Sequence, residues 1–294
     1  MHADTSPLLR FGVIADPQYA AVEPNLVLGR YYANSLTKLA EAIETFNAED
    51  LAFVVTLGDI IDRGWQSFDA ILPLYDKLRH PKHFLLGNHD FGVDPEKLGQ
   101  VFGRVGMPSP YQTFAMADWR FVLIDGNEAS LFAPPPGDPR RTAAETWIET
   151  LKSQGADNAH PWNAALGDVQ FAWLEETLRK AEAAGEQVVV MGHYPVYPPN
   201  AHNMWDSQRI VDLFGRFKNV GAYFCGHNHD GNYGLADGTH FVNIKGMVET
   251  PDTTAYAIVE IHADRMAIRG YGRETDRTLQ LETIMPRLVV AASR

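Results

Sequence analysis

The chain has 294 residues, of which 45% are hydrophobic, so it can bury a large core. Its 25 Lys and Arg residues and 37 Asp and Glu residues give a formal net charge of -12, which argues against nucleic acid as a partner. The single cysteine, Cys225, excludes an intrachain disulfide framework and a thiolate-rich zinc site.

Short apolar runs predict buried strands, and apolar residues at helical spacing predict amphipathic helices between some of them. Such alternation favours a largely parallel sheet covered by helices. A hairpin and three antiparallel strands are also expected, which implies a second, mixed sheet. In chain order, we predict strands at 9–15, 51–57, 82–86, 187–191 and 220–225, helices at 31–46 and 169–184, the hairpin at 111–124, and antiparallel strands at 239–244, 255–261 and 266–271.

Residues 126–167 are rich in proline and contain one short helical pattern near Trp147, so we interpret them as a lid-like insertion near a functional site. The whole chain, 1–294, is expected to form one domain. It contains no uninterrupted apolar run of about 18 residues and no basic start followed by an apolar segment. We therefore expect no membrane association and a cytoplasmic location, although a chain trimmed of a signal peptide would look the same.

Polar residues follow each of the five main predicted strands. Because the carboxyl ends of parallel strands meet at one edge of a sheet, these side chains are expected to gather there. A mixture of oxygen donors and imidazoles suits divalent transition metals. Seven ligand residues are too many for one ion but suit two ions that share a bridging carboxylate. Glycine precedes several of them, where a residue without Cβ permits a sharp exit from the strand. The candidate ligands are Asp16, Gln18, Asp59, Asn88, His193, His227 and His229.

The ordered motifs D-x-Q, GDxxDRG, GNHD, GHYPV and GHxH, between residues 16 and 229, resemble those of the calcineurin-like metallophosphoesterases. The resemblance implies a four-layer α/β/β/α sandwich of two mixed sheets with helices outside. It also assigns the candidate ligands. The first metal would take Asp16, Gln18, Asp59 and His229, and the second would take Asp59 as bridge with Asn88, His193 and His227.

Most of that superfamily has D-x-H where this chain has Asp16-Pro17-Gln18. The glutamine and its context resemble the branch of manganese-dependent ADP-ribose/CDP-alcohol diphosphatases. This resemblance implies hydrolysis of the phosphoanhydride bond of a nucleoside diphosphate derivative by a metal-bridging hydroxide. An amide oxygen in place of an imidazole makes the first position harder, which favours Mn²⁺ or Mg²⁺ over Zn²⁺, with Fe²⁺ also possible.

Other roles follow the resemblance and leave alternatives open. His89 matches the general acid of the family, or it orients the substrate. Arg63 is either a phosphate contact or an ordinary loop residue. The rings of Phe91, Tyr194 and Tyr197 flank the motifs and are candidate stacking surfaces for a base, although aromatic residues at strand ends are often packing residues. The alternative functions are a phosphomonoesterase, a cyclic nucleotide phosphodiesterase and a non-catalytic scaffold of the same fold.

Overall fold

The computed structural model describes residues 6–281, which form two six-stranded sheets. The first sheet has the order β12-β11-β10-β1-β2-β3, and the second has the order β4-β5-β6-β7-β9-β8. The strands of the first sheet are β1 Leu9–Ile14, β2 Phe53–Leu57, β3 Lys82–Leu85, β10 Ala255–Ile261, β11 Arg265–Gly272 and β12 Arg277–Gln280. Those of the second are β4 Gln112–Met116, β5 Trp119–Leu123, β6 Gln187–Met191, β7 Val220–Cys225, β8 Asn232–Ala236 and β9 Thr239–Asn243.

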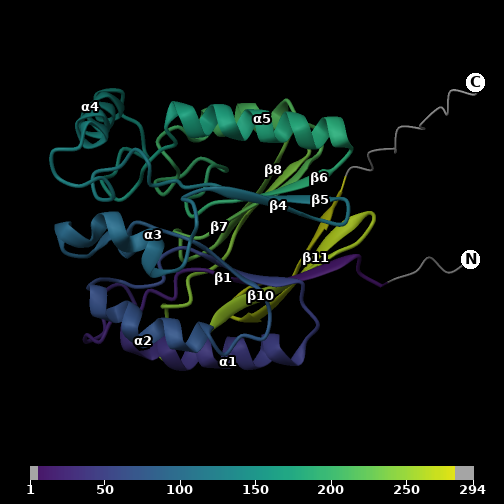
Figure 1. The fold of residues 1–294 in the computed structure, drawn as a ribbon, viewed down its shortest axis with the longest axis horizontal. Helices are drawn as coiled ribbons and strands as arrows, with labels where there is room; N and C mark the ends of the chain where they lie inside the picture. The colour runs from purple at the N-terminus through teal and green to yellow at the C-terminus, as the bar shows by residue number, and fades with distance from the viewer. Residues whose placement is uncertain (1–5, 282–294) are drawn as a thin grey trace, which may run out of the picture.

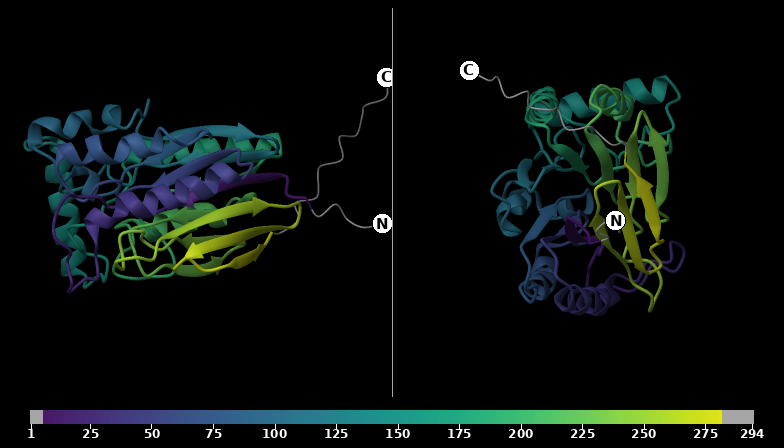
Figure 2. Two further views of the ribbon diagram at one scale, coloured as in Figure 1. Left: turned by 90° about the horizontal axis from the view of Figure 1, so that it is seen from below. Right: turned by 90° about the vertical axis from the view of Figure 1, so that its right-hand side faces the viewer.

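Helices cover the outer face of each sheet (Figures 1 and 2). The helices α1 and α2 pack on the first sheet, and α5 and α6 pack on the second. This arrangement is the predicted four-layer α/β/β/α sandwich. The α-helices are α1 Ser35–Ala48, α2 Trp65–Tyr75, α3 Val101–Arg104, α4 Pro139–Ser153, α5 Asp168–Ala184 and α6 Ser207–Gly215, and the 3-10 helices are η1 Tyr32–Asn34, η2 His89–Phe91 and η3 Pro95–Gln100.

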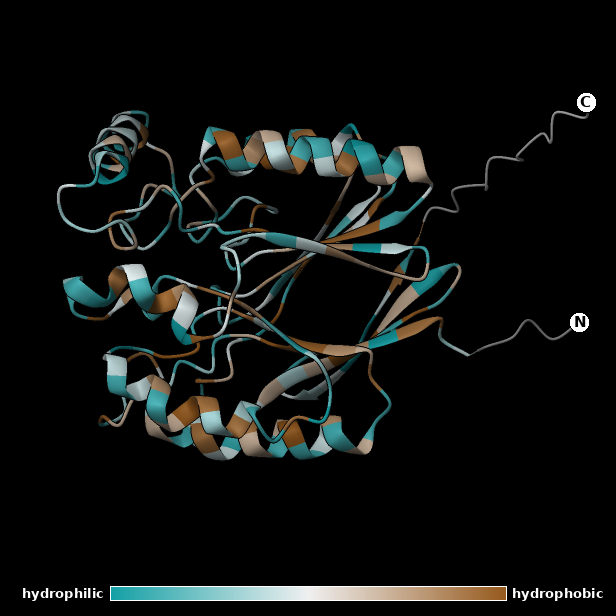
Figure 3. Ribbon diagram, viewed as in Figure 1, coloured by the Kyte–Doolittle hydropathy of each residue, from teal (hydrophilic) through white to brown (hydrophobic). Residues whose placement is uncertain are grey.

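The two sheets bury their facing sides against each other in an aromatic core. The ring of Phe11 on β1 stacks on Phe53 of β2 at 5.0 Å and meets Phe121 of β5 edge-on at 5.7 Å. Both faces of these strands are covered, so the strands are nearly continuous apolar runs. The outer helices alternate hydrophobic and hydrophilic residues, because one side packs on a sheet and the other meets solvent (Figure 3).

The structure corrects the predicted strand pairing in two ways. The five main strands do not share one sheet, since β1, β2 and β3 lie in the first and β6 and β7 in the second. Of the three antiparallel strands expected in the second sheet with the hairpin, only β9 lies there, paired with β7 and β8, whereas β10 and β11 belong to the first sheet. A strand's apolar pattern shows that it is buried but does not show which sheet it joins. The predicted hairpin is confirmed as β4 and β5.

The segment 126–167 is more ordered and more deeply packed than its composition suggests. Its helix α4 spans 15 residues, longer than the short pattern expected near Trp147. Asp138 begins this helix by accepting a hydrogen bond from the backbone N–H of Arg140. Ala144 and Ile148 of α4 pack with Trp205, from outside the segment. Among residues 6–281, no helix combines the length and the hydropathy needed to cross a bilayer.

Candidate metal centre

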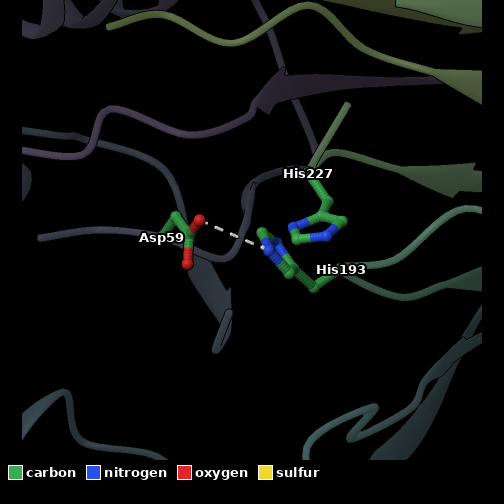
Figure 4. A group of neighbouring side chains, drawn as sticks. All are labelled: Asp59, His193 and His227. Carbon is green, nitrogen blue, oxygen red and sulfur yellow. Dashed lines mark ion pairs between the residues drawn. The ribbon is translucent and has the colours of Figure 1, made fainter. Parts of the chain in front are cut away.

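Two clusters of buried ligand atoms lie side by side and share one carboxylate. One consists of Asp16, Asp59 and His229, and the other of Asp59, His193 and His227; in each cluster the ligand atoms lie within 4.8 Å of one another. His229 Nε2 is 3.6 Å from Asp16 Oδ1, and His193 Nε2 is 3.4 Å from Asp59 Oδ2. Figure 4 shows the Asp59 carboxylate directed toward the His193 ring, with the His227 ring beside it. A shared carboxylate has two oxygens and can therefore bridge two neighbouring cations.

The candidate ligands come from both sheets, at the ends of β1, β2, β3, β6 and β7. Four of the candidate ligands have positive φ angles, which are uncommon for residues other than glycine. The angles are 50° at Asp16, 47° at Gln18, 50° at Asp59 and 66° at His227. Such conformations cost about 1 to 3 kcal/mol each and gather at functional sites. Backbone hydrogen bonds hold two of these residues together, since the N–H of Gln18 donates to the carbonyl of Asp59 at 2.7 Å.

The glycines before the candidate ligands also permit a close approach between segments, which the sequence did not predict. Only Gly58, before Asp59, has a positive φ, at 95°. At Gly87, before Asn88, a Cβ atom would lie 2.2 Å from Asp59 Oδ1 and 2.5 Å from the His193 ring. Any larger residue there would push into the cluster, so the absence of a side chain lets β3 approach the other ligands.

Gln18 provides the observation that best tests whether the site fits a metal. The residue is fully buried, and neither its amide oxygen nor its amide nitrogen has a hydrogen-bond partner among the described residues. A buried amide with no partner costs about 1 to 3 kcal/mol. A cation held between Gln18 and its neighbours would supply the missing interaction of the oxygen. The donor set of carboxylates, amides and imidazoles therefore fits divalent metals.

The electrostatics of the cluster also favour positive charge. Burial alone would lower the pKa of His193, but the carboxylates of Asp59 and Asp16 raise it to about 9. His193 Nδ1 donates to the carbonyl of Leu57 at 2.7 Å, so Nε2 faces Asp59 and the amide oxygen of Asn88, which is 3.3 Å away. The negative charge of the carboxylates favours a bound proton on His193. Divalent cations bound in the cluster would neutralise the same charge.

His89 lies at the edge of the cluster with its side chain 29% exposed. Its backbone N–H donates to Asp59 Oδ1 at 2.8 Å, which places the residue beside the shared carboxylate. Its Nδ1 is 3.1 Å from Oδ1 of the buried Asp62. Nδ1 also donates a hydrogen bond to the backbone carbonyl of Asp62 at 3.2 Å. Asp62 thus holds the Nδ1 side of the imidazole and leaves the Nε2 side for another partner, which is the arrangement expected of a proton donor.

Four polar residues outside the predicted ligand set support the centre, and sequence reasoning gave none of them a role. Asp90 is fully buried and accepts hydrogen bonds from the backbone N–H groups of Ile60, Ile61 and Gly87, which ties the ends of β2 and β3 together. Burial, together with the nearby charge of Asp59, raises the pKa of Asp90 to about 7. The others, each in contact with a histidine of the centre, are Asp62, Asn163 and Glu249.

The predicted stacking role is wrong for two of the aromatic candidates. Tyr194 is fully buried and donates its hydroxyl hydrogen to Asn127 Oδ1 at 2.7 Å. Phe91 is 4% exposed and belongs to the core beside the first sheet. Neither ring has a free face for a ligand, because both rings are buried by packing against neighbouring residues.

The two remaining candidate contacts stay predictions. The side chain of Arg63 is 62% exposed, and its Nε lies 2.5 Å from Asp62 Oδ2. Tyr197 is half-buried and packs against Phe241 at 5.2 Å. The half-buried ring of His202 lies 5.6 Å from that of His227. Nothing in the sequence spacing of His202 places it at the centre.

Comparison with known proteins agrees with this geometry. Residues 9–231 match the family model described as calcineurin-like phosphoesterase. The chain is 30% identical to a manganese-dependent ADP-ribose/CDP-alcohol diphosphatase of Mus musculus, over 94% of this chain and 95% of that protein. It is 29% identical to the Arabidopsis thaliana protein of the same name, over 92% of this chain and 96% of that protein.

A solved structure leads to the same fold. The crystal structure of a dimetal phosphatase from Danio rerio superposes with a TM-score of 0.84 at 25% identity, covering 94% of this chain and all of that one. The fold, the family match and the ligand clusters agree with one another. The chain therefore belongs to the calcineurin-like phosphoesterase family and is a metal-dependent hydrolase.

Proposed function

We propose that this protein hydrolyses the phosphoanhydride bond of nucleoside diphosphate derivatives such as ADP-ribose and CDP-alcohols. The names of the similar proteins support this substrate class. The single structural observation that carries the proposal is the buried, unpartnered amide of Gln18 within a cluster of carboxylates and imidazoles. Two divalent ions are the proposed cofactors, with Mn²⁺ preferred because an amide oxygen is a hard ligand.

The residues divide between two positions that share Asp59. The first metal position comprises Asp16, Gln18, Asp59 and His229, and the second comprises Asp59, Asn88, His193 and His227. The two clusters found among the described residues match this division. When bound, a pair of divalent ions polarises a phosphoryl group and lowers the pKa of a water molecule.

The chain's own groups then bind the substrate and move a proton. His89, whose Nδ1 side contacts Asp62, is proposed to donate a proton to the leaving oxygen. The exposed guanidinium of Arg63 is available to a phosphate oxygen at the rim. The segment 126–167 is proposed as a lid over the substrate. The two metal positions and Arg63 would supply the local positive charge that a nucleotide needs. The acidic protein would then not need a basic surface to bind it.

A substrate panel tests the proposal. Full-length protein with Mn²⁺ is incubated with ADP-ribose, CDP-choline, a phosphomonoester and a cyclic nucleotide, and the products are separated by chromatography. The expected result is release of AMP or CMP, with kcat/KM at least about tenfold above the monoester, a gap of about 1.4 kcal/mol in transition-state binding. Asp59→Asn serves as the inactive control for contaminating hydrolases.

Each outcome assigns the function. If the monoester or the cyclic nucleotide reacts faster, the site is a phosphomonoesterase or a cyclic phosphodiesterase. If no substrate reacts under any metal, the chain is a scaffold of the same fold. Activity should vanish on chelation and return best with Mn²⁺, ahead of Mg²⁺, Fe²⁺ and Zn²⁺. Full turnover in a sample that elemental analysis shows to be metal-free contradicts the mechanism.

A further inference from the structure

Glu249 contacts a candidate ligand from outside the metal centre. Its Oε1 lies 2.7 Å from His229 Nδ1, while Nε2 on the other side of the same ring is 3.6 Å from Asp16 Oδ1. The contact is shielded from solvent, with side-chain exposures of 7% for His229 and 15% for Glu249. An ionised carboxylate can only accept a hydrogen bond, so Nδ1 carries the hydrogen and the lone pair of a neutral ring lies on Nε2.

The backbone that carries Glu249 is fixed to the first metal position. Residues 247 and 248 donate their backbone N–H groups to the carbonyls of Ala15 and Asp16, at 2.9 Å and 3.0 Å. Gly246 packs against the His229 ring so closely that a Cβ atom there would lie 2.6 Å from it. These contacts fix the position of the segment relative to both Asp16 and His229. The backbone from which the Glu249 side chain extends is therefore held in place.

A buried lysine holds the same segment from its other side. Lys38 on α1 is 2% exposed, and its ammonium group donates to the carbonyls of Met247, Glu249 and Thr250 at 3.0, 2.8 and 2.5 Å. Such a set of bonds from a buried cation makes the segment rigid, because each broken bond would leave an unpaired polar group. Rigid support is what a residue needs in order to orient a ligand.

We propose that Glu249 is a positioning residue for the first metal position, where it fixes the tautomer and orientation of His229 and makes its Nε2 a stronger donor. A carboxylate behind a metal-binding imidazole raises the basicity of the ligand, and loss of such a partner typically costs about 10- to 100-fold in metal affinity. The inference deepens the proposed function and rests on its metal assignment.

The proposal also explains how this position works with a glutamine. Gln18 offers a neutral amide oxygen, a weaker donor to a transition metal than an imidazole. Glu249 adds negative charge behind His229, in the same position, and so compensates for that weakness. His193, which belongs to the second position, instead donates from Nδ1 to a neutral backbone carbonyl, that of Leu57.

Glu249 has a second partner, which suggests the matched control. Arg30 Nε lies 3.3 Å from the same oxygen, Glu249 Oε1. If Glu249 served only to pair with Arg30, removing either residue would have the same effect on the metals. If Glu249 acts on His229, removing Arg30 leaves the carboxylate and its contact in place.

The test is a titration of the metal-stripped full chain with Mn²⁺. Binding is measured by calorimetry and by the electron paramagnetic resonance signal of free Mn²⁺. The wild type is expected to bind two ions. Glu249→Gln, which keeps the shape, should weaken one of the two binding steps about tenfold, and Glu249→Leu should weaken it up to about 100-fold. Arg30→Gln should leave both steps within about twofold of the wild-type values. Thermal unfolding in EDTA checks that each variant is folded.

The outcomes separate the inference from the function on which it rests. If the wild type binds two Mn²⁺ ions and Glu249→Gln leaves both affinities within about twofold, the positioning role is wrong and the proposed function stands. Equal losses in Arg30→Gln and Glu249→Gln also overturn that role, because the ion pair would then explain the effect. A wild type that binds no Mn²⁺ overturns the metal assignment itself. Should Glu249→Leu fail to fold, the isosteric Glu249→Gln decides.

Discussion

Asn163 and His227 form a hydrogen bond of 2.9 Å between the Asn163 side-chain oxygen and His227 Nε2, which connects the segment 126–167 to a candidate metal ligand. Asn163 is fully buried, and its amide nitrogen donates to the carbonyls of Asn158 and Ala201 at 3.0 Å and 2.7 Å. These two bonds orient the amide so that its oxygen must face the histidine. The segment therefore contributes to the wall of the candidate metal centre in addition to any role as a lid.

Asn163→Ala should destabilise the protein and loosen His227. Removing a buried amide that makes several hydrogen bonds leaves unpaired groups, at a cost of about 1 to 3 kcal/mol in the free energy of unfolding. Urea unfolding in EDTA measures the stability, and Mn²⁺ titration measures the second position. The neighbouring Trp162→Ala, at a residue 41% exposed, is the control. Equal stability of Asn163→Ala and the control would show that this hydrogen bond is not important.

His89→Ala should reduce hydrolysis of substrates with poor leaving groups by about 10²- to 10⁴-fold, because a general acid matters most when the leaving oxygen is basic. The loss should be smaller for a nitrophenyl ester, whose leaving group needs no proton. Metal content, measured by elemental analysis, should stay unchanged, since His89 is outside the ligand set. Equal losses on both substrates would assign His89 to substrate positioning.

Gln18→His should tighten the first metal position by replacing an amide oxygen with an imidazole. The variant should retain more metal through gel filtration and should tolerate Zn²⁺ or Fe²⁺ better than the wild type does. Elemental analysis after filtration and activity under each metal provide the measurements. Asn127→His, a similar exchange at a buried asparagine outside the ligand set, is the control. Unchanged metal retention and preference in Gln18→His would show that Gln18 is not a ligand.

Asp206 should make the stability of the fold depend on pH. The residue is 7% exposed, and burial raises its pKa to about 7, opposed in part by the charge of Arg209. A carboxyl with a raised pKa in the folded state binds its proton more tightly there than in the unfolded chain. Its contribution to stability is therefore fully present below the unfolded pKa of about 3.9 and is lost as the pH rises through about 7.

Asp206→Asn removes this titratable carboxyl group and should flatten the pH dependence of the free energy of unfolding. The variant should be more stable than the wild type at pH 8, because it buries a neutral amide in place of an anion, and asparagine still suits the start of α6. Urea unfolding in EDTA at a series of pH values between about 4 and 8 measures the difference. Parallel stability curves for the two proteins would mean that Asp206 does not titrate in this range.

The sequence alone predicted the residues that gather in the candidate site and most of the elements that carry them. Asp16, Asp59 and His193 each follow an apolar run, and the runs became β1, β2 and β6 nearly to the residue. This works because a buried strand and the turn after it are local features, which hydrophobic periodicity and glycine position record directly. The order of the motifs then implied the fold through its resemblance to a family.

Tertiary structure decided how these parts meet. The sequence does not show that β1 and β6 belong to different sheets, because pairing depends on contacts between distant segments. It also does not distinguish a buried ring from a ligand-binding one, and Tyr194 is buried because strand ends converge on it. The partners Asn163 and Glu249 lie 64 and 20 residues from the histidines that they contact, so no local pattern reveals them. A local pattern encodes an element and its end, while the neighbours of a side chain are set only when the whole chain folds.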